Sequence, residues 1–161
     1  MRLEKLLLFF AATAMLVAPA GAADVAPADH GIFTPDAIHW AAAPAALPAG
    51  AKLAVLEGDP GKDGPFTMRL WMPAGYKIPP HSHPAPEHVT VVSGTFSVGL
   101  GDTFDKTKGN KLPAGTFAFL APQMHHFAFT TKETVIQLHG IGPWQINYLN
   151  AADDPRNAKK N

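Results

Sequence analysis

The sequence predicts an all-β domain in which short strands form a sandwich or a barrel. Eight short runs, apolar or alternating between apolar and polar residues, are separated by Gly, Pro, Asp and Asn, a pattern typical of such folds. Apolar residues alternate through 66–72, as in a strand with one buried face. No long segment has helical periodicity, and 161 residues suit one domain.

The expected strands follow one another closely along the chain. They cover residues 52–56, 66–72, 87–93, 95–100, 116–120, 126–130, 134–139 and 144–149. Gly75 and Gly94 indicate turns that enclose a strand, a hairpin and a second strand. A polar loop over 101–111 joins the two halves, and 151–161 form a polar tail. The barrel is therefore expected over residues 51–150.

The first 22 residues have the pattern of an export signal. Arg2 and Lys5 precede an apolar run over 6–17, and small residues follow at 20–22, as before a signal peptidase site. The run is too short to span a bilayer comfortably, and it lacks the cationic face of a membrane-surface helix. We therefore expect a mature protein that begins near Ala23, is periplasmic or secreted, and has no further membrane contact.

Residues 23–50 are rich in Ala and Pro and are expected to form an N-terminal arm. Thr34 followed by proline predicts a helical turn that runs through His39. Phe33 and Trp40 are large apolar residues that need cover, which either the chain's own barrel or a partner subunit can supply. The second alternative predicts a homodimer.

The composition excludes several classes of function. The chain has 13 basic and 13 acidic residues and no cysteine. Without cysteine there are no disulfides, thiolate nucleophiles or iron–sulfur clusters. The lysines of the 101–111 loop lie among aspartates, and only two lysines near the end form a basic tail. Nucleic-acid partners are therefore not expected.

His81, His83 and Glu87 are the candidate metal ligands. In an extended segment, side chains two residues apart point to the same face, so His81 and His83 can reach one ion together. Glu87 has an even offset from both, although the prolines at 84 and 86 bend the path. Taken alone, a His-x-His pair also fits a solvated or hydrogen-bonded pair of histidines.

The residues around these ligands resemble the first sequence motif of the cupin family. Gly75 is followed by five residues, His81-x-His83, three residues, Glu87, six residues and Gly94, and each fixed position matches. The resemblance covers about residues 52–149. It implies a double-stranded β-helix, a small jelly roll with a metal site inside the mouth of the barrel.

The second cupin motif matches only in part. Pro113 and Gly115 are present, two adjacent histidines follow, and Thr130 stands where the family often has asparagine. Adjacent residues cannot share one face of a strand. The resemblance favours His126 as the fourth ligand because it opens the strand after a proline turn, and His125 would then point outward.

Three neutral imidazoles and one carboxylate suit one divalent transition metal, namely Fe, Mn, Ni, Co or Zn. Four protein ligands on an octahedral ion leave two positions for water, substrate or dioxygen. Glu87 has a second possible role as a catalytic base beside a bound substrate.

Several other side chains are candidates for the substrate pocket or for ordinary core. Arg69 is the one barrel arginine that could bind an acidic substrate, whereas Gln137 and His139 share a strand face that could line the barrel. His88 should point away from the ligands. The apolar candidates are Met68, Leu70, Met72, Phe117, Phe119 and Met124.

The sequence thus indicates an exported, metal-dependent cupin, with an oxygenase acting on a small organic molecule as the first hypothesis. That reaction comes only from the resemblance. A redox-neutral lyase, isomerase or decarboxylase that uses Glu87 as base is the second. A non-catalytic module that binds a metal or a small ligand is the third, since fold does not determine function.

Overall fold

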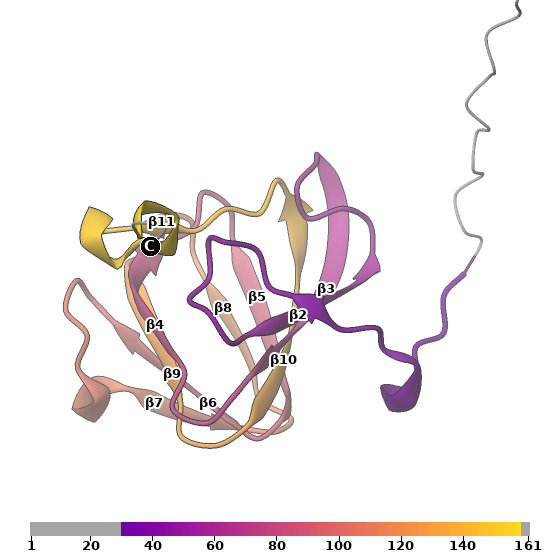
Figure 1. Cartoon of the computed structure of the whole chain (residues 1–161), viewed down its shortest axis with the longest axis horizontal. Helices are drawn as coiled ribbons and strands as arrows, with labels where there is room; N and C mark the ends of the chain where they lie inside the picture. The colour runs from indigo at the N-terminus through magenta and orange to yellow at the C-terminus, as the bar shows by residue number, and fades with distance from the viewer. Residues whose placement is uncertain (1–29, 159–161) are drawn as a thin grey trace, which may run out of the picture.

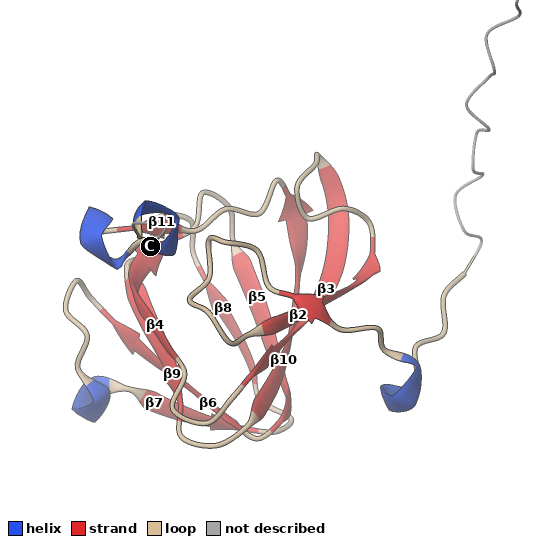
Figure 2. Ribbon diagram, viewed as in Figure 1, coloured by secondary structure: helices blue, strands red, loops and turns tan. Residues whose placement is uncertain are grey.

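The computed structural model describes residues 30–158, which form two antiparallel β-sheets packed face to face (Figures 1 and 2). One sheet has six strands in the order β1-β2-β3-β10-β5-β8, and the other has five in the order β11-β4-β9-β6-β7. The predicted all-β class is confirmed, and the architecture is a jelly roll. Among the described residues no helix is long and apolar enough to cross a membrane.

The strands are short, as the turn signals indicate. The first sheet contains β1 (Ala41–Ala42), β2 (Lys52–Glu57), β3 (Gly64–Met72), β10 (Thr134–Gly142), β5 (Glu87–Ser93) and β8 (Phe117–Leu120). The second contains β11 (Asn147–Tyr148), β4 (Lys77–Ser82), β9 (His126–Thr130), β6 (Thr95–Leu100) and β7 (Asn110–Pro113). Four 3-10 turns complete the fold: η1 (Pro35–Ala37), η2 (Lys106–Lys108), η3 (Ala151–Asp153) and η4 (Pro155–Asn157).

The hydrophobic core lies between the two sheets. Alternate residues of β3 face inward, and Met68 and Leu70 are 0% and 2% exposed. Ile136 and Leu138 of β10 are each 2% exposed, because strict alternation places every second residue on the buried face. This core surrounds one polar region, which lies near the ends of β4, β5 and β9.

The glycines that enclose the first motif adopt conformations that require glycine. Gly75 has φ +78° and Gly94 has φ +80°, values in the left-handed region that other residues rarely adopt. At Gly94 a Cβ atom would also collide with the backbone at Glu133 and Thr134. The turns expected at both positions are thus present.

Three observed strands have no counterpart among the eight expected apolar runs, although the turn at Gly75 predicts a strand before the hairpin, and β4 is that strand. β4 contains Pro79 and Pro80, which interrupt an alternating pattern, and its pairing with β9 is irregular between Ile78 and His81. β7 is a polar edge strand in which Leu112 is the only large apolar residue, and β1 consists of two alanines. The run expected over 144–149 is a strand only at Asn147–Tyr148.

The N-terminal arm is divided in two. Its helical turn ends at Ala37, short of His39, and Thr34 makes no side-chain capping bond. From Ala41 onward the segment belongs to the barrel, since β1 pairs with β2 and Leu47 is 4% exposed in the core. Residues 30–40 extend away from the barrel (Figure 1). The proposed export signal lies outside the described residues.

Candidate metal centre

Three histidines from two neighbouring strands of the five-stranded sheet meet inside the barrel. His81 in β4 lies directly opposite His126 in β9, and His83 follows the end of β4. All three are buried, with exposures of 2–3%. Their ligand atoms all lie within 4.8 Å of one another, so a single ion could contact each ring. We call His81, His83 and His126 the histidine cluster.

Backbone carbonyls orient all three rings. The Nδ1 atoms of His81, His83 and His126 lie 2.8, 2.5 and 3.0 Å from the carbonyl oxygens of Pro79, Gln145 and Met124 respectively. A carbonyl only accepts hydrogen bonds, so each Nδ1 carries a proton, and Nε2 is the nitrogen whose lone pair is available in the neutral form of each ring. Hydrogen bonds of this kind select the nitrogen that is free to bind a metal.

Glu87 opens β5 in the facing sheet and completes the group. Its two carboxylate oxygens each lie 3.4 Å from an Nε2 atom, one of His83 and the other of His126. These distances are long for hydrogen bonds, and the buried Nε2 of His83 has no hydrogen-bond partner. A carboxylate this close to the Nε2 atoms of two histidines of the cluster fits a cation placed between them.

The charge state of the cluster also suits a cation. Burial, with smaller contributions from His126 and His83, lowers the pKa of His81 to about 3, so this ring is neutral at pH 7. Burial would raise the pKa of Glu87, but a hydrogen bond from His126 and the positive charges that the rings of His83 and His126 carry in their protonated forms outweigh it and lower this pKa to about 2. Glu87 is therefore anionic, and a divalent ion would offset its buried charge.

The space beside the cluster is small, with a volume of about 20 Å³. That is room for about one water molecule. Trp144 stacks on His83 with ring centroids 5.5 Å apart. The cavity is lined by Leu47, Leu70, Ile78, His81, His83, Glu87, Phe96, His126, Ala128, Ile136, Leu138, Trp144 and Ile146.

His125 lies outside the barrel, as the sequence predicts. Its side chain is 46% exposed, and its Nδ1 is 2.7 Å from a carboxylate oxygen of Asp102. Thr130, at the position where asparagine is common in the second motif, is buried and donates to the carbonyl of Pro73. This threonine therefore fixes a turn of the backbone and does not point to the cluster.

Most of the candidate pocket residues do not line this cavity. Leu70 lines the cavity, and Met68 and Met72 lie in the adjoining core. Arg69 alternates with them, so it must face outward, where it donates to Gln137 of β10 at 3.1 Å. His139 shares this outer face. Phe117, Phe119 and Met124 are 54%, 70% and 37% exposed.

An open groove of about 420 Å³ lies on the outer face of the six-stranded sheet, remote from the histidine cluster. His88 and His139 stack in it with ring centroids 5.0 Å apart. His88 thus points away from Glu87, as the strand alternation predicts. The groove is larger than the inner cavity, but it holds neither the histidine cluster nor Glu87.

The sequence interpretation missed the residues that cover the cluster. Trp144 and Ile146 come from the segment between β10 and β11, and Leu47 comes from the segment assigned to the arm. The carbonyl of Gln145, which orients His83, is a backbone group that no side-chain pattern reveals. The one available signal was the apolar character of 144–149.

Comparisons with known proteins agree with this geometry. The model of a family described as the ChrR cupin-like domain matches residues 28–145, more than half of the chain. No curated protein matches the chain in sequence.

Solved structures with the same fold include an acetylacetone dioxygenase from Acinetobacter johnsonii, with TM-score 0.57 and 16% identity over 78% of this chain and 80% of that chain. The polyketide cyclase RemF from Streptomyces resistomycificus has TM-score 0.55 and 16% identity over 65% and 75%. An RmlC-like cupin from Shewanella frigidimarina has TM-score 0.53 and 16% identity over 77% and 95%. At these identities the likeness establishes the fold alone.

Proposed function

Because the chain belongs to the ChrR cupin-like family, we propose that it holds one divalent transition-metal ion between the histidine cluster and Glu87. The observation that carries this proposal is the orientation of the three imidazoles. Each ring has its Nδ1 at a backbone carbonyl, which leaves the Nε2 atoms to share one point. The nitrogen and oxygen donors suit Fe, Mn, Ni, Co or Zn.

We further propose that the protein is an oxidoreductase, an oxygenase that acts on a small organic molecule. A bound ion would supply Lewis acidity and, if it is iron or manganese, electron transfer. The chain's own residues would orient the ligating rings, supply the negative charge of Glu87 and exclude bulk water with apolar side chains such as Leu70 and Ile146. An acetylacetone dioxygenase has the same fold, which is compatible with this proposed reaction.

A second candidate is a non-catalytic metal-binding module. The observation that favours it is the cavity volume of about 20 Å³, whereas sites for organic ligands usually exceed 300 Å³. Catalysis on an organic molecule therefore requires that the cover over the cluster moves. Trp144, which stacks on His83, is the largest side chain that would have to shift.

Oxygen uptake separates the two candidates. The full chain, loaded with Fe(II) or Mn(II), is mixed with a panel of phenolic and keto-acid compounds while dissolved oxygen is recorded. Substrate-dependent uptake that His81→Ala abolishes supports the oxygenase. Tight binding of one ion per chain without turnover of any compound supports the module, and turnover without oxygen would support redox-neutral chemistry at Glu87.

We also propose that the protein acts after export, in the periplasm or outside the cell. The basic, apolar and small-residue regions of 1–22 support this proposal. Mass spectrometry of the protein recovered from the source cells tests it. A chain that begins near Ala23 is expected, and a chain that retains Met1 would contradict it.

A further inference from the structure

The segment between β10 and β11 covers the histidine cluster and contacts it directly. Trp144 packs its ring on His83, and Ile146 is 2% exposed and lines the cavity. Between them, the carbonyl of Gln145 accepts the hydrogen bond from Nδ1 of His83. We call residues 143–146 the strap. The orientation of His83 thus depends on where the strap lies.

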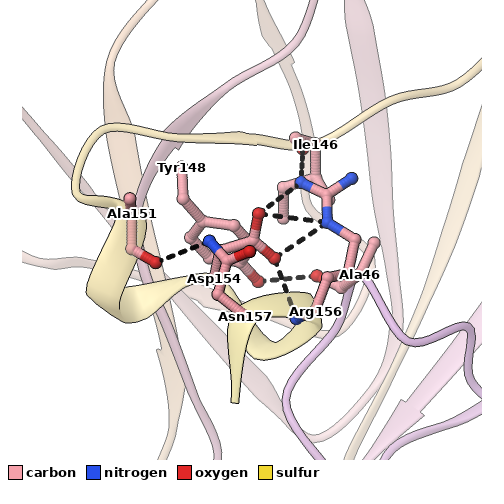
Figure 3. Close-up of polar contacts among 7 residues, drawn as sticks. All are labelled: Ala46, Ile146, Tyr148, Ala151, Asp154, Arg156 and Asn157. Atoms are coloured by element: carbon pink, nitrogen blue, oxygen red, sulfur yellow. Dashed lines mark hydrogen bonds and ion pairs between the residues drawn. The ribbon is translucent and has the colours of Figure 1, made fainter. Parts of the chain in front are cut away.

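The strap is held from outside by an arginine of the C-terminal tail (Figure 3). Nη2 of Arg156 donates to the carbonyl of Ile146 at 3.1 Å. The same guanidinium makes a two-pronged contact with Asp154, from Nε to Oδ1 and from Nη2 to Oδ2, each at 2.8 Å. Because the guanidinium is planar, this contact with Asp154 fixes the direction in which it meets the strap.

Other hydrogen bonds fix the chain on either side, and the side chain of Ile146 packs in the core, while Arg156 binds the carbonyl of Ile146 itself. Upstream, the backbone nitrogen of Trp144 donates to the carbonyl of Pro60 at 2.6 Å. Downstream, β11 pairs with β4, and the hydroxyl of Tyr148 donates to the carbonyl of Ala46 at 2.8 Å (Figure 3). The carbonyl of Ile146, next to that of Gln145, is held by Arg156.

We propose that Arg156 is a positioning residue for the histidine cluster. By holding the carbonyl of Ile146, it fixes the neighbouring carbonyl of Gln145, and this in turn keeps Nε2 of His83 free and directed at the ion. The inference rests on the proposed metal binding. The family match ends at residue 145, so Ile146, Asp154 and Arg156 all lie beyond the part of the chain that the family describes.

The effect of losing Arg156 should be local. Its side chain is 47% exposed, and ion pairs this accessible contribute little to global stability. Removing a hydrogen bond that orients a ligand, in contrast, typically weakens metal binding by about 10–100-fold. Because Arg156 acts through one further peptide unit, we expect an effect near the lower end, about tenfold.

The test compares Arg156→Ala and Arg156→Lys with Arg69→Ala in the full-length chain. Arg69 is a matched control because its side chain also donates a hydrogen bond to another side chain, that of Gln137. Both residues lie in the six-stranded sheet, whereas the strap leads into the five-stranded one. Two quantities are measured: the rate at which Zn²⁺ passes from loaded protein to an excess of chelator, and the side-chain NMR signal of the His83 Nδ1–H in metal-free protein.

We expect Arg156→Ala to release Zn²⁺ about tenfold faster and to broaden the Nδ1–H signal of His83 by exchange with water. Arg156→Lys keeps a positive donor but not the planar guanidinium, so its Zn²⁺ release rate should lie between those of Arg156→Ala and the unmodified chain. Arg69→Ala should release Zn²⁺ at the rate of the unmodified chain. Equal release rates and an unchanged signal in all proteins would overturn the inference while leaving metal binding intact. If the unmodified chain takes up no metal, the proposed function fails, and the NMR signal alone decides the role of Arg156.

Discussion

His81 and His126 face each other across β4 and β9, with ring centroids 4.1 Å apart and planes inclined by 57°. They are cross-strand partners, so the register of the sheet sets their separation before any ion binds. His83 then approaches the same point from just beyond the end of β4. The fold itself therefore supplies a preformed set of nitrogen donors.

The two adjacent histidines of the second motif should behave differently. His126→Ala removes a buried ligand and is expected to reduce bound metal to less than about a tenth, in line with the loss of one ligand from a site of four. His125→Ala changes an exposed side chain that pairs with Asp102 and should leave the metal content unchanged. Metal analysis of both purified variants checks this, and equal losses would show that the wrong histidine has been assigned.

Trp144 should affect stability and access together. Trp144→Ala removes a ring that stacks on His83 and should lower the free energy of unfolding by about 2 kcal/mol, less than for a fully buried tryptophan because Trp144 is only partly buried. Trp144→Phe keeps most of the packing and is the matched control. Urea unfolding gives the stability, and Zn²⁺ release to a chelator gives the access. Slower release from Trp144→Ala would contradict a covering role.

Two tyrosines, of which Tyr76 is buried and Tyr148 partly buried, make the fold sensitive to alkali. Burial raises the pKa of Tyr76 and of Tyr148 above the ordinary value of 10.0. Above pH 10 the unfolded chain loses these protons first, so the unfolded state binds fewer protons and stability falls as pH rises. Both hydroxyls donate to carbonyls of the segment that carries Leu47, at Pro48 and Ala46.

Urea unfolding between pH 8 and pH 11 measures this effect. The midpoint is expected to fall above pH 10, and Tyr76→Phe should remove part of the decline because it removes one titrating group. A midpoint that is constant to pH 11, or a decline that the substitution leaves unchanged, would contradict this explanation.

The outcome for the pocket residues shows what alternation can and cannot predict. The His-x-His spacing places both imidazoles on one face, and Glu87 reaches His83 and His126 across the bend at Pro84. The same rule separates Arg69 from Met68 and Leu70, so either the arginine or the two apolar side chains can face the interior, but not both. In β10, residues 135, 137 and 139 lie on one face and residues 136 and 138 on the other, and both faces contain apolar residues. Only the pairing with β3 and β5 decides which face is buried.

Other parts of the site have no pattern to read. A backbone carbonyl such as that of Gln145 can orient His83 whatever its side chain, because the contact depends on tertiary packing. Leu47 lies in a segment whose Ala- and Pro-rich composition resembles a linker, yet it lines the cavity. The sequence motif predicts that the histidines meet, whereas the residues that cover them can be identified only from the folded structure.

A substitution pair tests this division of inner and outer faces. Leu70→Ala should lower the free energy of unfolding by about 3 kcal/mol, because it opens a cavity in the core. Phe119→Ala, at a residue that is 70% exposed, should change it by less than about 0.5 kcal/mol. Chemical denaturation of both variants measures the difference, and a reversed order would place Phe119 inside the barrel.

The extended arm should mediate self-association. Ile32 and Phe33 are 81% and 43% exposed on a segment that extends away from the barrel, and a second copy could cover them. We expect a homodimer for the chain that begins at Ala23 and a monomer for a chain that begins at His39, which keeps β1 and Leu47. Light scattering coupled to gel filtration measures both masses. The same oligomeric state for both chains would remove residues 23–38 from any interface.

Side-chain NMR of the histidine nitrogens tests metal binding at the cluster most directly. Spectra of the metal-free chain are recorded before and after one equivalent of Zn²⁺ is added. We predict that the Nε2 signals of His81, His83 and His126 shift on binding while those of the five other histidines stay in place. Shifts confined to exposed histidines, or no shift in these three, would contradict the metal centre.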